Sequence, residues 1–303
     1  MHWIDDSIEE WLVPERSGES PYRHLRLRER PDGRDVGLKA LAKLVEAAHE
    51  DAITWLRSIS TNALDPLQGA EDGATEANAP PPPGSNYPHG LHTITLQGYL
   101  GEILAGLIAE NYRPFDLDWE VPVFLFRHHD AAFNQLERQR FLGSAAVRPV
   151  PGRFGNDCLA FTREDGEVSA FLTCEAKCTA SHDASLIADG HKQLSSNDAH
   201  IPVDLYQLLD VLRSRGDPEA DTWVTQLSPL LTLSASDAPQ HYDLFVYVCG
   251  RDRQKGGPWM STSSAHARYE AERELEAAEV RFEDIDAVIV TTYPGHSISR
   301  GNG

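Results

Sequence analysis

The sequence predicts an α/β protein built on a mixed sheet, and three observations support that class. Hydrophobic residues make up 41% of the 303 residues, which is enough for one sizeable core. Stretches with the apolar spacing of helices alternate with short apolar runs that are typical of strands. From residue 93 onward these stretches follow the order helix, three strands, helix, strand, which is typical of a mixed sheet covered by helices.

Three stretches of the chain differ in composition. Residues 1–60 are expected to form a small, mainly helical segment, because apolar residues recur at helical spacing from residue 36 to 59. Residues 61–92 contain few large apolar groups and a run of prolines, which favours a Pro/Gly-rich linker or loop. Residues 93–303 are expected to form the main globular domain.

A charged stretch at residues 23–30 precedes the first long helix. Leu25 and Leu27 alternate there with charged residues, so we expect a short edge strand. The stretch holds a dense basic cluster, which is usually a solvated face. Contact with nucleic acid is the functional alternative.

The main domain shows both periodicities in turn. Apolar residues three and four apart mark helices, whereas short apolar and aromatic runs mark strands. In chain order we expect a helix at 97–111, strands at 119–126, 157–162 and 168–177, helices at 183–194 and 202–215, a strand at 242–249, a polar helix at 263–279 and a last strand at 285–292.

The net charge of -20 limits the partners that the chain can bind alone. A protein that grips nucleic acid usually has a basic patch, and this chain would repel phosphate at long range. A DNA-binding role therefore needs another subunit to deliver the DNA, or basic residues gathered on one face. The acidic N-terminus and the lack of a long apolar run predict a cytoplasmic protein without a membrane span. The four cysteines fit buried thiols better than disulfides or a zinc site.

One hairpin carries charged residues in a specific arrangement. Asp165-Gly166 between two apolar runs predicts a tight turn. A two-residue loop there would turn Asp157 and Glu175 to opposite faces of the hairpin. A three-residue loop at 164–166, or a bulge with the same effect, would put Asp157, Glu175 and Lys177 on one face. The two carboxylates would then be on the order of 5 to 7 Å apart.

Two neighbouring carboxylates on buried strands repel each other and favour a bound cation. Oxygen ligands suit Mg²⁺, for which Mn²⁺ can substitute, and such a metal activates a water and stabilises charge on a phosphate. Lys177 would orient or deprotonate that water. The simpler alternative is a salt bridge between Glu175 and Lys177 on an exposed strand face. The apolar flanks and Asp157 favour the metal site.

An Asp and, later on the same hairpin, a Glu-Ala-Lys sequence resemble the PD-(D/E)xK nuclease superfamily. The resemblance implies a restriction-endonuclease-like core with the order α-β-β-β-α-β and metal-dependent hydrolysis of phosphodiester bonds in DNA. It also implies a third metal-binding carboxylate from the first core helix, here Glu102. The helix after the lysine can supply a further polar residue, here Gln193. Gly155-Asn156 stands where the superfamily motif has its proline, before Asp157.

The closer resemblance, over most of residues 90–292, is to the nuclease subunit of the Hachiman anti-phage defence system. It depends on a Gly-Glu helix, a Gly-x-Asp strand, a Glu-Ala-Lys strand, a following helix and a late Val-Ile-Val strand, in that order. It implies an endonuclease that serves as a defence effector. A separate superfamily-2 helicase would restrain it until DNA is damaged or unwound. That helicase would hold the DNA, which reconciles nuclease activity with the charge of -20.

Two other interpretations stay open. The chain could be another nuclease of the superfamily, such as a restriction enzyme or an effector regulated by a nucleotide signal. It could also be a non-catalytic interaction subunit with the hairpin as its interface. The sequence has no Walker-type phosphate loop, so neither ATPase activity nor a small-molecule cofactor is expected. His128-His129-Asp130 is expected at a loop or strand end, and His191 at the surface rather than as a general base.

Overall fold

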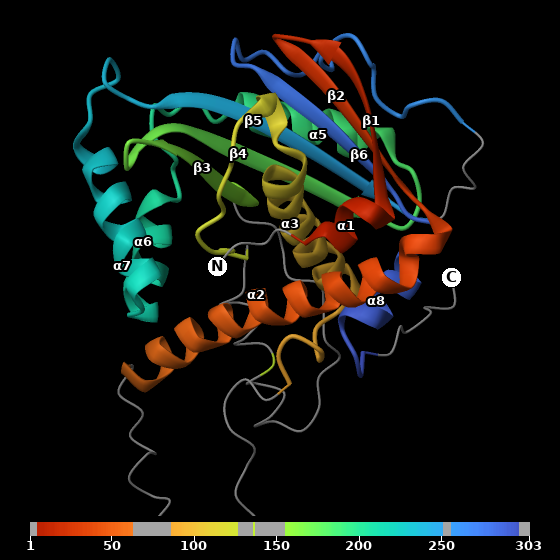
Figure 1. The fold of residues 1–303 in the computed structure, drawn as a ribbon, viewed down its shortest axis with the longest axis horizontal. Coiled ribbons are helices and arrows are strands. Elements are labelled where there is room, and N and C mark those ends of the chain that lie inside the picture. Colours follow the sequence, from red (N-terminus) through yellow and green to blue (C-terminus); the bar gives the residue numbers. More distant parts are fainter. Residues whose placement is uncertain (1–4, 63–85, 127–135, 137–154, 251–255, 297–303) are drawn as a thin grey trace, which may run out of the picture.

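The structure is a computed structural model that describes residues 5–62, 86–126, 136, 155–250 and 256–296. Within that part of the chain, six strands form one mixed sheet with the order β1-β2-β6-β5-β4-β3 (Figure 1). The α/β class with a mixed sheet is therefore confirmed. The strands are β1 (Leu12–Glu19), β2 (Tyr22–Glu29), β3 (Cys158–Glu164), β4 (Glu167–Thr179), β5 (Gln240–Cys249) and β6 (Leu275–Arg281).

Helices cover both faces of this sheet. α3 packs on one face, where a Cβ on its Gly101 would lie 3.3 and 3.4 Å from the Cβ atoms of Cys178 and Ala176 in β4. α5 packs on the opposite face, where Gly190 approaches the ring of Phe245 in β5. The helices are α1 (Asp6–Trp11), α2 (Arg34–Asn62), α3 (Thr93–Tyr112), α5 (Ala184–Ser195), α6 (Leu205–Arg215), α7 (Pro218–Leu227) and α8 (Ile285–Thr292).

The N-terminal stretch, expected to be mainly helical, also contributes two strands to the common sheet. The expected helix at 36–59 is confirmed as α2 and the expected strand at 23–30 as β2. The prediction of an edge strand is wrong, because β2 pairs with β6 on one side and β1 on the other. Leu25 and Leu27 are buried in the main core, which holds this charged strand inside the sheet. Figure 1 shows α2 and α3 below the sheet, with α6 and α7 near β3.

The expected helix at 263–279 is wrong. Residues 275–281 form β6, which lies between β2 and β5 and is buried along its whole length. Leu, Glu and Ala favour helices, but pairing and burial between two strands outweigh that propensity. The buried Glu279 is tolerated there because its carboxylate accepts hydrogen bonds from the Arg281 guanidinium and the Met260 N–H.

The expected last strand at 285–292 is also wrong, because this segment is the helix α8. Asp284 caps the helix, since its Oδ1 accepts the N–H groups of Asp286 and Ala287 at 2.9 and 3.1 Å. The cap and the helical spacing of apolar residues outweigh the β-branched composition. The buried positions of α8 are Ile285, Val288, Ile289 and Thr292.

The expected strand at 119–126 is not formed in the described chain. Glu120 makes an isolated bridge with Phe161, but no strand extends from it. Pro122 has no N–H for a ladder, and the N–H of Val121 donates instead to the Glu110 carboxylate. The helix α7 was not expected. The other expected elements are confirmed as α3, β3, β4, α5, α6 and β5.

Some expectations fall partly outside the described residues. These are the linker at 61–92, of which only residues 86–92 and the end of α2 are described, and the His128-His129-Asp130 sequence. All four cysteines are free thiols, as expected, and Cys158, Cys174 and Cys249 are buried. No helix in the described ranges is long and apolar enough to cross a membrane.

Candidate active site

The strands β3 and β4 form an antiparallel hairpin with a two-residue turn at Asp165-Gly166. Both turn residues have positive φ, as this tight turn requires. The expected three-residue loop is therefore wrong. A bulge in the hairpin has the same effect, because it shifts the register by one residue and pairs Cys158 with Cys174. Asp157 consequently lies beside Glu175.

Asp157 precedes β3 and is tied to β4 at two points. Its N–H donates to the Cys174 carbonyl at 2.9 Å, and its Oδ2 accepts the N–H of Ala176 at 2.7 Å. The residue is only 5% exposed. The backbone of β4 therefore holds this carboxylate next to Glu175.

Glu175 and Lys177 lie two residues apart on β4 and project from the sheet face that α5 covers. The Lys177 Nζ donates to the Glu175 Oε1 at 2.6 Å. Glu175 is 1% exposed, whereas the side chain of Lys177 is 22% exposed. The pair is therefore not a salt bridge on an exposed strand face. Instead, a buried carboxylate contacts the ammonium group of a partly exposed lysine.

Gln193 joins this pair from α5. Its Oε1 accepts a hydrogen bond from the Lys177 Nζ at 3.3 Å. The helix begins where the Asp183 carboxylate accepts the N–H of Ser185 at 2.8 Å, and Gly190 allows the helix to approach β5 closely. The expected residue of the helix after the lysine is thus brought to the site.

Glu102 lies in α3 and is also buried. Burial raises the pKa of Tyr99 and of Tyr293 well above the ordinary value, and the charge of Glu102 adds to both shifts. Glu102 therefore lies near these two phenols. Among the described residues, no group of three or more His, Cys, Asp or Glu side chains is arranged to hold a metal ion. The role of Glu102 as a third ligand stays a prediction.

His191 is not a surface histidine, contrary to the expectation. It is 1% exposed, and its Nδ1 donates to the Ile187 carbonyl at 2.8 Å. Burial lowers its pKa from 6.5 to about 4, although the hydrogen bond to Ile187 opposes the shift. His191 packs against Phe245 as part of the interior.

Asp243 is a buried charge that the sequence pattern did not single out. Its Oδ1 accepts the Thr173 hydroxyl at 2.6 Å, and its Oδ2 accepts the Tyr269 hydroxyl at 2.7 Å and the Arg273 Nε at 3.0 Å. Burial raises its pKa, but the hydrogen bond from His241 and the charge of Arg273 outweigh burial and lower it. A signal was available, since a carboxylate inside an apolar strand is costly unless it is paired.

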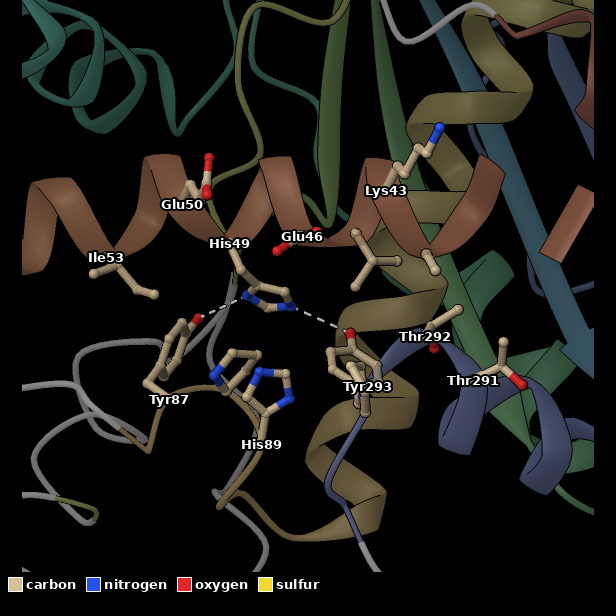
Figure 2. Close-up of a pocket in the computed structure, with 14 residues that line it drawn as sticks. Lys43, Glu46, His49, Glu50, Ile53, Tyr87, His89, Thr291, Thr292 and Tyr293 are labelled. Atoms are coloured by element: carbon tan, nitrogen blue, oxygen red, sulfur yellow. Dashed lines mark hydrogen bonds between the residues drawn. The ribbon is translucent and has the colours of Figure 1, made fainter. Parts of the chain in front are cut away.

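A hollow of about 310 Å³ lies away from this site, between α2, residues 87–89 and the end of α8. In Figure 2, His49 projects from α2 toward two tyrosines. Its Nδ1 lies 3.2 Å from the Tyr87 hydroxyl, and its Nε2 lies 3.2 Å from the Tyr293 hydroxyl. Both ring nitrogens are thus engaged, which leaves neither for a metal.

Hydrogen bonds thus join Glu175, Lys177 and Gln193, and Asp157 is bonded to the same strand through the Ala176 N–H. Comparison of the sequence with protein-family models and with curated proteins finds no match.

Proposed function

We propose that this chain is a metal-dependent deoxyribonuclease with Asp157, Glu175 and Lys177 in its active site. One observation carries the proposal: the buried Asp157 carboxylate is bonded to the Ala176 N–H, directly after the buried Glu175, and the partly exposed Lys177 contacts Glu175. Burying two neighbouring carboxylates is costly without a cation. A structural salt bridge needs only one of them, so the second carboxylate favours a metal site.

The donor set fits a hard cation such as Mg²⁺ or Mn²⁺. Asp157 and Glu175 offer carboxylate oxygens, and Mg²⁺ in proteins commonly takes one or two carboxylates and completes its shell with water and substrate phosphate. The metal, when bound, would lower the pKa of a water and stabilise charge on the scissile phosphate. The Ala176 N–H holds one oxygen of Asp157, so the carboxylate has a fixed orientation.

Lys177 and Gln193 supply the remaining polar groups. The Lys177 side chain is 22% exposed, and its ammonium group would attract a phosphate oxygen and orient the attacking water. Gln193 contacts the same Nζ from α5 and limits its rotamers. The chain thus places the Lys177 ammonium group against the buried Glu175 carboxylate and the Gln193 amide oxygen.

The order of the elements supports membership in the PD-(D/E)xK superfamily. α3, β3, β4, α5 and β5 follow one another in the order that this core requires, with β4 and β5 parallel, but the first core strand, expected at 119–126, is not formed in the described residues. The likeness to the Hachiman nuclease subunit is reduced by one feature, because the late Val-Ile-Val segment is the helix α8. The role as a defence effector with a separate helicase is part of the proposal. The charge of -20 supports it, since such a partner would hold the DNA.

Cleavage of plasmid DNA with Mg²⁺ or Mn²⁺ tests the proposal. Wild type is expected to cleave in at least one of two conditions, alone or with a helicase partner, and Glu175→Gln and Lys177→Met are each expected to lose about 100-fold or more of that cleavage. Glu167→Gln, at an exposed position of the same strand, is the matched control and should cleave normally. Cleavage that survives both site substitutions would reject the site. A wild type that cleaves no DNA under any of these conditions would favour a non-catalytic interaction subunit.

A further inference from the structure

Two consecutive helices begin at aspartates that behave differently. Asp217 precedes α7, and its Oδ1 accepts the N–H of Ala220 at 2.9 Å, which is the usual cap. Asp204 occupies the same position before α6 but makes no side-chain bond to its helix. Its Oδ2 instead accepts the N–H of Asn156 at 2.6 Å, 48 residues earlier in the chain. The Asp204 carboxylate thus binds the backbone of the segment that leads into Asp157.

Gly155 leaves room for the contact between Asp204 and the Asn156 N–H. Its φ of +143° lies in a region that favours glycine, and a Cβ there would lie 2.9 and 3.0 Å from the two carboxylate oxygens of Asp204. Any side chain at this position would push the carboxylate away from the backbone. The Gly155-Asn156 sequence, found where the superfamily motif has a proline, therefore provides space and an N–H that proline lacks.

Asn156 is held from a second direction. The Asn197 Nδ2 donates to its Oδ1 at 2.8 Å, from the segment after α5. Asp204 is anchored in turn, because α6 buries its apolar face in the second hydrophobic core with Leu205, Leu208 and Leu209. The segment before Asp157 is consequently held by the residue that precedes α6 and by the segment that follows α5.

We propose that Asp204 is a positioning residue for Asp157, an inference that depends on the proposed nuclease function. Its charge-assisted hydrogen bond fixes the Asn156 N–H, and Asn156 in turn fixes the position of the backbone of Asp157, the next residue. The Ala176 N–H then fixes the carboxylate of Asp157. Asp204 thus acts on metal affinity without contacting metal or substrate, as outer hydrogen-bond partners of metal ligands do.

Mn²⁺ affinity, measured by electron paramagnetic resonance on the whole chain, is the main test. Asp204→Ala is expected to weaken Mn²⁺ binding about 10- to 100-fold, the usual range for outer partners of metal ligands. Asp204→Asn keeps an oxygen acceptor and should retain more of the affinity. Asp217→Ala is the matched control: it should lower Tm by a few degrees through the lost cap and leave Mn²⁺ affinity unchanged. Hydrogen exchange of a peptide spanning 155–159 should be faster in metal-free Asp204→Ala than in wild type.

The outcomes separate this inference from the proposed function. If wild type binds Mn²⁺ and Asp204→Ala binds it within twofold of wild type, the positioning role is rejected and the nuclease proposal stands. An equal loss of affinity in Asp217→Ala would also reject it, because general destabilisation would explain both variants. If wild type binds no Mn²⁺, the metal site and the role of Asp204 toward it are rejected together.

Discussion

Acid should destabilise this protein through His191. The folded chain holds this imidazole neutral, because burial lowers its pKa from 6.5 to about 4. In the unfolded chain the pKa returns to about 6.5, so the unfolded state binds a proton at pH values where the folded state does not. Stability is therefore unaffected by His191 above about pH 6.5, falls as the pH drops toward about 4, and levels off below that. The full effect is about 3 kcal/mol, of which about 2 kcal/mol is reached at pH 5.

Urea unfolding at pH 7.5 and pH 5, followed by tryptophan fluorescence, measures this contribution. His191→Gln is neutral at both pH values, so its free energy of unfolding should fall by about 2 kcal/mol less than that of wild type between them. His200→Gln, at an exposed histidine, is the control and should follow wild type. If His191→Gln loses as much stability as wild type on acidification, then the buried imidazole is not the titrating group and the reasoning fails.

Two further substitutions test the packing around the site by urea unfolding. Arg273→Met removes two contacts of 3.0 and 2.9 Å to the fully buried Asp243 and should cost about 3–5 kcal/mol. Adding Asp243→Asn should recover part of that loss, and a single-variant loss below about 1 kcal/mol would contradict the buried pair. Gly190→Ala places a Cβ 2.1 Å from the Phe245 ring and should cost about 1–3 kcal/mol. Gly190→Ala should cost less in a Phe245→Leu background, where the ring is absent. An unchanged cost in that background would refute the clash.

Local patterns predicted the arrangement of the charged hairpin. The turn at Asp165-Gly166 places Asp157 and Glu175 on one face only if the loop has an odd number of residues or the hairpin has a bulge. The bulge is what forms. Period 2 along β4 was enough to place Glu175 and Lys177 on the same side. Gln193 came from the resemblance, in which the helix after the lysine can supply a polar residue. The hairpin could be predicted because its turn and its alternation depend on residues close in sequence.

The sequence by itself determined the α/β class, the main helices and the charged hairpin, since their periodicities come from backbone geometry. Only the tertiary structure decided that residues 275–281 form a strand and residues 285–292 a helix, against their composition. Pairing with β2 and β5 stabilises the strand, and a cap with a buried face stabilises the helix. The tertiary structure also decided that the Asp204 carboxylate accepts a hydrogen bond from Asn156 rather than from its own helix. Contacts between distant segments outweigh local propensities of less than about 1 kcal/mol per residue.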